Sequence, residues 1–243
     1  MKEAALRLVS VQTGLPRTRG EAGSRDPMRA EWTSAIFKQP VSGRVFLSRE
    51  GLEGDGQADR ASHGGPDRAV LMYAAAHYPA WRDELGIDLP AGAFGENFTL
   101  EGVDETTACV GDTLALGEAV VQISQPRGPC WKIARRWERR DLLERVVATG
   151  RTGWYGRVAR EGFVWADAGC VRIERPCPGW TVARVAALRS DVAAPVADLE
   201  FLAACPWLSR ERRRRFAAVA ARRRSEAHRV PGSPPAAARA PGA

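Results

Sequence analysis

Short strand-like segments separated by turns run through the first two thirds of the chain, and this spacing constrains the fold more than any other feature. Several segments alternate with a period of two, so Leu114 and Leu116 share one face, as do Val121 and Ile123. A sheet of many short strands protects its edges by curling, so the pattern predicts a mainly β fold, a closed or partly closed antiparallel barrel. The expected strands are residues 6–12, 45–48, 69–73, 97–100, 113–116, 120–124, 157–160 and 171–174.

Helical patterns accompany this barrel and follow it. Residues 75–85 form an amphipathic pattern, and residues 129–148 fit one bent helix or two. The Gly-, Arg- and Ser-rich stretch 17–31 predicts a mobile loop. Three short helices that cannot bury much alone are expected after the barrel, over residues 181–189, 195–205 and 209–223.

The last of these helices has a clear start and an apolar face. Ser209 and Glu211 suit its first turn, because an oxygen cap and a negative charge oppose the helix dipole. Leu208, Phe216 and Val219 fall on one helical face. We therefore predict peripheral helices and a small three-helix appendage, divided as a barrel domain at 1–180, an appendage at 181–228 and a disordered tail at 229–243.

The net charge of +7 belongs to one end of the chain. Ten arginines and two acidic residues between 209 and 243 carry +8, so residues 1–208 carry −1. A basic helix such as residues 210–224 usually presents a solvated face, and the alternative is a nucleic-acid partner. The nearly neutral body offers no second basic surface, so we do not expect nucleic-acid binding.

The five cysteines are odd in number and form no CxxC pair, which argues against a disulfide framework and a structural zinc site. No apolar run approaches the roughly 20 residues that span a bilayer. Arg7, Gln12 and Thr13 interrupt the start, so a secretory signal is not expected. These features predict a soluble cytoplasmic protein without a membrane partner.

The stretch GLEGDGQADRASHGGPDRAV, residues 51–70, suits an anion or ligand loop. Its glycines, including the pair Gly64-Gly65, let a ligand approach the main chain, where successive N–H groups can hold an anion. His63, Asp67 and Arg68 add polar groups around the second loop. The alternative is that the glycines only make tight turns.

A second stretch, QPRGPCWK at residues 125–132, singles out one cysteine. Pro129 suits the first turn of a helix, which places Cys130 at a helix N-terminus beside Arg127 and Lys132. The helix dipole and both cations favour the thiolate, the form that attacks electrophiles or binds soft metals. Burial as an inert side chain, the commonest fate of a free cysteine, is expected for the other four, Cys109, Cys170, Cys177 and Cys205.

Two weaker motifs complete the candidates. GAFGENF at residues 92–98 carries Gly95, Glu96 and Asn97, and GRTGWYG at residues 150–156 carries Arg151 and Thr152. Polar groups among glycines and aromatic rings suit a planar heteroaromatic ligand held by stacking and edge hydrogen bonds. Ordinary aromatic core contacts explain the rings equally well.

Together these segments resemble the MOSC family, named for the molybdenum cofactor sulfurase C-terminal domain, and in particular its stand-alone YiiM-type branch. The resemblance covers residues 6–184 in order. It rests on GLEGDGQAD (51–59), HGGPDRAV (63–70), AHYPAW (76–81), FGENFT (94–99), GDTLALGEAVVQISQPRGPC (111–130) and TGRTGWYGRV (149–158).

The resemblance implies a MOSC-type β-barrel that holds a molybdenum cofactor, Mo-molybdopterin, with Cys130 as the metal ligand. It also implies reduction of N-hydroxylated compounds such as hydroxylaminopurine bases, a detoxifying activity. Cys130 and His63 are then the catalytic candidates, with His63 delivering protons because its unperturbed pKa lies near neutrality. The cofactor-binding candidates are His63, Gly64, Gly65, Asp67, Arg68, Gly95, Glu96, Asn97, Arg127 and Cys130.

This reduction needs two electrons, which no side chain stores reversibly and a molybdenum centre does. The chain carries no iron–sulfur cysteine set and no GxGxxG fingerprint in a βαβ context. A separate flavin or iron–sulfur reductase is therefore expected to supply the electrons. The long loop at residues 16–32 and the Arg-rich end depart from a minimal member, so partner contacts and a homodimer stay open.

Three other functions compete with this one. A non-enzymatic carrier would use Cys130 for a persulfide or for transfer of the mature cofactor, since a thiolate suits sulfur transfer as well as metal ligation. A nucleic-acid module would rest on residues 210–224. A hydrolase using Cys130 and His63 ranks last, because the sequence supplies no evident oxyanion hole or third partner.

Overall fold

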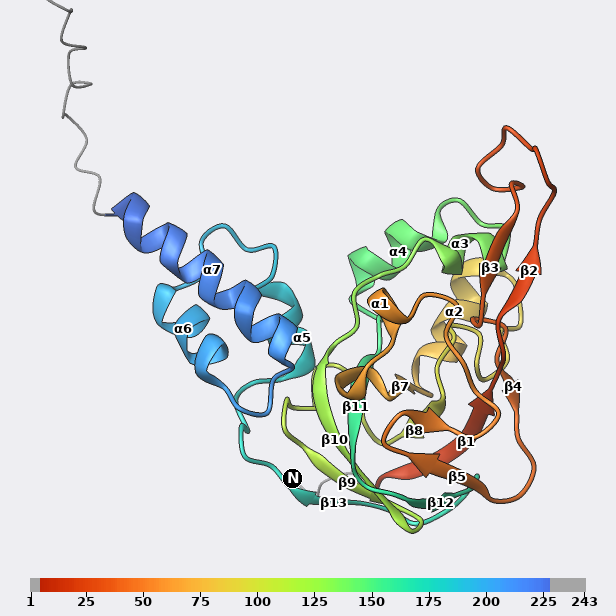
Figure 1. Cartoon of the computed structure of the whole chain (residues 1–243), viewed down its shortest axis with the longest axis horizontal. Helices are drawn as coiled ribbons and strands as arrows, with labels where there is room; N and C mark the ends of the chain where they lie inside the picture. Colours follow the sequence, from red (N-terminus) through yellow and green to blue (C-terminus); the bar gives the residue numbers. More distant parts are fainter. Residues whose placement is uncertain (1–4, 228–243) are drawn as a thin grey trace, which may run out of the picture.

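The computed structural model describes residues 5–227, and one curled eight-stranded sheet forms its centre (Figure 1). Arg7 in the first strand bridges to Gly169, just before the last strand, so the sheet is a partly closed barrel, as predicted. The order across the sheet is β13-β9-β10-β11-β7-β8-β1-β4. These strands are β1 (Arg7–Thr13), β4 (Gln39–Pro40), β7 (Val70–Ala74), β8 (Phe98–Glu101), β9 (Thr113–Leu116), β10 (Ala119–Pro126), β11 (Trp154–Arg160) and β13 (Cys170–Glu174).

One strand pair departs from the antiparallel prediction. β7 and β8 run parallel, with Met72 opposite Phe98 and Ala74 opposite Leu100. A parallel pair needs a crossover connection, and α2 (His77–Leu85) supplies it. All five residues of β7 are buried, as expected for a strand covered on both faces.

The prediction of a mobile loop over residues 17–31 is wrong near both ends of that stretch. β2 (Arg17–Arg19) pairs with β3 (Trp32–Ser34) in a two-stranded arm, and a bridge joins Glu21 to Ala30. Every residue of β2 is exposed, so the strand lacks the apolar alternation that reveals strands in a sequence. A third, small sheet contains β5 (Val45–Ser48), β6 (Gly51–Leu52) and β12 (Gly162–Val164).

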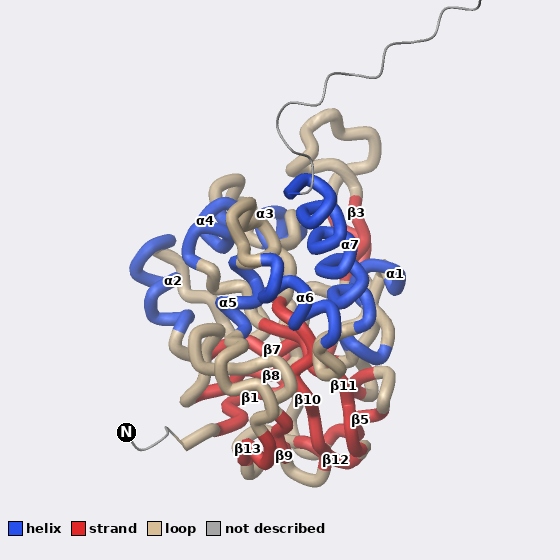
Figure 2. Tube along the Cα trace, turned by 90° about the vertical axis from the view of Figure 1, so that its left-hand side faces the viewer, coloured by secondary structure: helices blue, strands red, loops and turns tan. Residues whose placement is uncertain are grey.

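The barrel interior is apolar, and the peripheral helices gather toward one end of the strands (Figure 2). Residues 129–148 hold two helices rather than one. A second apolar cluster, which includes Trp81, Phe94, Ile133 and Leu142, joins α2, α3 (Lys132–Arg136) and α4 (Leu142–Thr149) to the barrel. The remaining helices beside the barrel are α1 (Arg60–His63) and the 3-10 turn η1 (Pro66–Arg68). Within residues 5–227 we find no helix with the length and apolarity that a membrane crossing needs.

Three further helices form a small bundle beside the barrel (Figure 1). They are α5 (Val182–Ala187), α6 (Val196–Ala204) and α7 (Arg210–Ala227), which confirms the three predicted helices. Leu208 and Phe216 are buried in their common core, with Val219 packed against it. The boundary at residue 180 stays a prediction, and the tail at residues 229–243 lies outside the described part of the chain.

The start of α7 is fastened to the barrel. The Ser209 amide donates to the carbonyl of Ser124 in β10 at 2.9 Å, and the Arg210 amide donates to Asp67 Oδ2 at 3.1 Å. Ser209 also caps the helix as predicted, since its Oγ accepts from the Arg212 amide at 3.3 Å. The first turn of α7 is therefore held against the loop that precedes β7.

Candidate functional site

Cys130 lies in the wall of two adjoining cavities. The first, here called the barrel cavity, measures about 80 Å³ and is lined by barrel residues that include Lys38, Asp55 and Arg127. The second, the helix cavity, measures about 600 Å³ and lies between the barrel and α7, with Gln125 and Arg212 in its lining. Both cavities share Asp59, His63, Arg68, Cys130, Lys132 and Tyr155.

Cys130 is half-buried, and it is placed two residues before α3 rather than in the first turn of the helix. Its carbonyl accepts from the Ile133 amide at 3.1 Å, which holds the loop against the helix. The other four cysteines are buried, as predicted, and none of them lines either cavity. Burial raises the pKa of the Cys170 thiol to about 11.

His63 ends α1 and faces both cavities. Burial lowers its pKa below the usual 6.5, and the positive charges of Lys132 and Arg127 lower it further. The imidazole is therefore mainly neutral at pH 7. A neutral imidazole can accept a proton from one group and pass one to another, which is the chemistry that proton delivery requires.

Two arginines line the cavities beside Cys130: Arg68 lines both, and Arg127 lines the barrel cavity. Arg68 forms an ion pair with Glu211 of α7, and its side chain is 13% exposed. Arg127 is 6% exposed, and its amide donates to the Gly153 carbonyl at 3.1 Å. Two arginines thus place positive charge around a half-buried thiol.

The GENF loop contributes less to the cavities than the sequence suggests. Gly95 and Asn97 line the barrel cavity, and Gly95 adopts φ 82° where a Cβ would lie 2.9 Å from Ile36 Cγ1. Glu96 does not reach it, because the side chain is fully buried and accepts from the amides of Gly92 and Phe94 at 2.6 and 3.1 Å. The carboxylate orders the loop.

Gly64, Gly65 and Asp67 also lie outside the lining of both cavities. Gly65 has φ 91° at the start of η1, a conformation that favours glycine. Asp67 pairs with Arg157 at 2.8 Å and accepts from the Arg210 amide. These residues shape the loop and anchor α7 rather than face the cavities.

A buried ion pair in the barrel cavity escapes the sequence analysis. Lys38 and Asp55 form it, with side chains 6% and 3% exposed, and Asp55 also accepts from Asn97 Nδ2 at 2.9 Å. Burial lowers the pKa of Lys38, and Asp55 opposes this shift. Asp55 lies inside the GLEGDGQAD motif, which is a usable signal, whereas nothing around Lys38 marks it.

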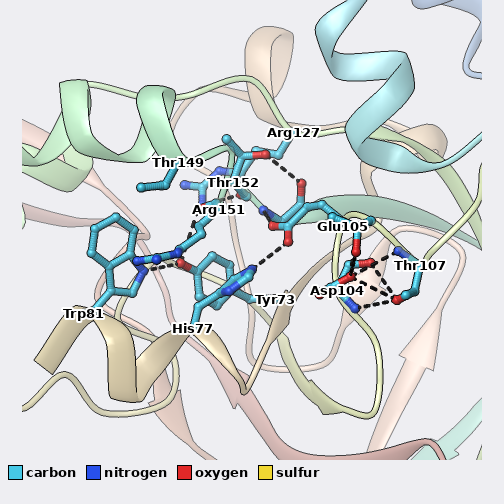
Figure 3. Close-up of polar contacts among 12 residues, drawn as sticks. Tyr73, His77, Trp81, Asp104, Glu105, Thr107, Arg127, Thr149, Arg151 and Thr152 are labelled. Carbon is cyan, nitrogen blue, oxygen red and sulfur yellow. Dashed lines mark hydrogen bonds and ion pairs between the residues drawn. The ribbon is translucent and has the colours of Figure 1, made fainter. Parts of the chain in front are cut away.

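A third cavity of about 450 Å³, the side cavity, shares Arg127 with the barrel cavity. In Figure 3 the His77 ring points at the Glu105 carboxylate, with Nε2 and Oε2 2.6 Å apart. Arg151 and Thr152 of the GRTGWYG motif line this cavity and not the barrel cavity. The GRTGWYG motif is thus divided between cavities, because its Tyr155 lines the barrel cavity and the helix cavity.

The partly closed barrel, the two cavities lined by cations and the half-buried thiol define a β-barrel domain with a candidate ligand site. The chain belongs to the MOSC family, whose domain model matches residues 59–170, and it is a YiiM-type member. The crystal structure of YiiM from Geobacillus stearothermophilus superposes with a TM-score of 0.71 and 31% identity over 88% of this chain and 98% of that one.

Two relatives extend the comparison. The Bacillus subtilis protein named Uncharacterized protein YflK is 42% identical over 182 residues, covering 75% of this chain and 80% of YflK. A Gibberella moniliformis protein named Reductase is 38% identical over 182 residues, covering 73% of this chain but only 32% of that protein. The chain thus spans about a third of the length of the fungal reductase.

Proposed function

We propose that this protein is a molybdenum-cofactor oxidoreductase that reduces N-hydroxylated compounds, including hydroxylaminopurine-type bases. The observation that carries the proposal is Cys130, a half-buried thiol at the junction of two cavities lined by cations. The family supports a function related to the molybdenum cofactor, and the relative named Reductase supports the oxidoreductase class.

The residues present fit such a cofactor. The helix cavity has room for a planar heteroaromatic group, and the buried Gln125 Oε1 in its wall has no hydrogen-bond partner within residues 5–227. A pterin edge with N–H groups would satisfy that acceptor. The described residues contain no cluster of three or more His, Cys, Asp or Glu suited to a metal. Cys130 would be the protein ligand of the molybdenum.

When bound, the cofactor would supply a metal centre that takes up and returns an electron pair. Cys130 would hold that metal as a soft ligand, while Arg127 and Arg68 would bind and orient anionic or edge groups. The neutral His63 imidazole would deliver protons to the N-hydroxyl oxygen, which leaves as a water molecule. Electrons would come from a separate flavin or iron–sulfur reductase.

Metal and pterin content of protein purified from a molybdopterin-producing host tests the ligand. We expect molybdenum to fall at least tenfold in Cys130→Ala. Cys170→Ala is the matched control, because it removes a buried thiol that lines neither cavity. Molybdenum retained at the wild-type level in Cys130→Ala would remove the proposed ligand.

A non-enzymatic carrier is the second candidate, and the half-buried state of Cys130 beside the 48% exposed Trp131 favours it. A carrier thiol must meet the partner that takes its sulfur or cofactor. Turnover of 6-hydroxylaminopurine by the loaded protein with an artificial electron donor would support the reductase. Loaded protein that shows no turnover and passes molybdenum to another apoenzyme would support the carrier.

A further inference from the structure

Arg212, in the first turn of α7, is a buried cation whose hydrogen-bonding capacity is only partly used. The residue is 7% exposed, and its Nε and Nη1 atoms have no hydrogen-bond partner in the described part of the chain. A buried donor without a partner is costly, and a charged one more so. The helix dipole adds to the cost, because it disfavours a cation near a helix N-terminus.

The unpartnered guanidinium lies in the wall of the helix cavity. Gly128 lies close to this guanidinium. A Cβ added at Gly128 would stand 3.8 Å from Arg212 Nη2 and 3.1 Å from Arg189 Nη1. The absence of a side chain at Gly128 lets two arginines approach the loop that carries Cys130. The cavity wall therefore combines unused donors with a close approach to the loop that carries Cys130.

The charge around this wall is positive. Arg68, Lys132 and Arg215 line the helix cavity with Arg212, against the two carboxylates of Asp59 and Glu211. Arg68 and Arg215 both pair with Glu211, so one carboxylate is shared between two guanidinium groups. Burial lowers the pKa of Arg212 to about 10, with Arg189 and Arg215 adding to the shift, and the side chain is still charged at pH 7.

We propose that α7 supplies a phosphate site, in which Arg212, assisted by Arg68 and Arg215, binds a phosphate monoester dianion in the helix cavity. A guanidinium presents its donors in a planar fork that matches two oxygens of a phosphate. The dianion would satisfy the unused donors and balance the charge. The basic helix α7 then forms one wall of the ligand cavity in addition to presenting arginines to solvent.

Two kinds of molecule could bring a phosphate monoester into this cavity. One is the phosphate of a bound pterin cofactor, and the other is the 5′-phosphate of a nucleotide substrate, which would extend the substrate class from bases to nucleotides. The phosphate site itself rests only on the geometry of α7. The choice between the two sources rests on the proposed function.

Thermal unfolding of apoprotein, made in a host that cannot synthesise molybdopterin, tests the site directly. We expect 10 mM inorganic phosphate to raise the melting temperature of the wild type by several degrees over chloride at equal ionic strength. The shift should vanish in Arg212→Met and persist in Arg214→Met, which removes one exposed charge from the same helix. No shift in the wild type, or an equal shift in Arg212→Met, overturns the proposal.

Protein from a molybdopterin-producing host then identifies the source. Loss of pterin and molybdenum in Arg212→Met, with both retained in Arg214→Met, assigns the site to the cofactor phosphate. Retained cofactor, with AMP no longer stabilising more than adenosine, assigns it to a nucleotide. Wild-type protein that holds no molybdenum would contradict the proposed function but leave the phosphate result on the apoprotein intact.

Discussion

Lys38 and Arg212 are buried cations in different regions of the same candidate site, one on the barrel side and one in the appendage. Lys38 is 6% exposed and pairs with Asp55, whose oxygens also accept from Gly14 and Asn97. Arg212 is 7% exposed and leaves two nitrogen atoms without partners among the described residues. The two side chains are therefore equally buried, but the protein supplies partners for Lys38 and leaves Arg212 partly without them.

The difference separates structural charge from charge reserved for a ligand. A buried cation that the chain itself neutralises holds loops together, and removing its partner leaves an uncompensated charge. A buried cation that the chain leaves unsatisfied lowers the stability of the free protein, and an anion would recover that loss on binding. Variants on the two sides should thus change stability in opposite directions.

The largest effect is expected at the paired cation. Asp55→Asn leaves Lys38 charged and buried without its counterion, so the free energy of unfolding should fall by about 3–5 kcal/mol. Denaturant unfolding of the apoprotein measures it. The double variant Asp55→Asn/Lys38→Met should recover much of the loss, and a double variant as unstable as the single one would show that the charge is not the cause.

Arg212→Met should have the opposite sign. Removing an unsatisfied buried charge while keeping the apolar stem should raise the free energy of unfolding of the apoprotein by about 1–3 kcal/mol. The same denaturant titration checks this expectation. A clear loss of stability would mean that Arg212 is satisfied in the free protein, and the contrast with Lys38 would disappear.

A substitution of the helix cap sharpens the comparison, because it weakens the first turn of α7 and leaves the charged side chains of the helix unchanged. Ser209→Ala removes the acceptor for the Arg212 amide and should lower stability by about 1 kcal/mol. Thr181→Ala is the matched control, because Thr181 caps α5 through the Arg184 amide at 3.1 Å and lines none of the three cavities. Both losses should be similar, but only Ser209→Ala should weaken the phosphate-induced rise in melting temperature.

The smallest effect concerns the neutral imidazole between these regions. The pKa of His63 is lower in the folded protein than the usual 6.5, so the unfolded chain binds its proton more readily. His63 therefore contributes stability above pH 6.5 that is lost as the pH falls through the folded pKa. In melting curves between pH 7.5 and pH 5, His63→Gln should lose less stability than the wild type, and parallel profiles would contradict the lowered pKa.

Local patterns predicted most of the fold, but not its pairing. Every predicted strand is present, because period-two segments bounded by glycine and proline are visible in one sequence. The parallel pair of β7 and β8 depends on how α2 packs, which is a long-range property. The β2–β3 arm lacks apolar alternation and so resembled a loop.

The site was predictable where its residues lie in motifs. Cys130, His63, Arg68, Arg127 and Asn97 all line the barrel cavity, although they come from three separate segments of the sequence. Part of the remaining lining carries no local signal, namely Ser34, Ala35, Ile36 and Lys38. Gln125 and Tyr155 lie in the QPRGPCWK and GRTGWYG motifs but were not named as candidates, and Arg212 was one of a run of arginines. Only tertiary packing places these three residues in the wall of the helix cavity.

The order of the chain has a consequence for how the protein matures. The barrel strands end at Glu174, whereas the helix that closes the cavity beside Cys130 starts at Arg210. During synthesis the barrel leaves the ribosome first, with that wall still missing. We therefore expect a nascent chain to acquire its ligand only after the closing helix has emerged and docked.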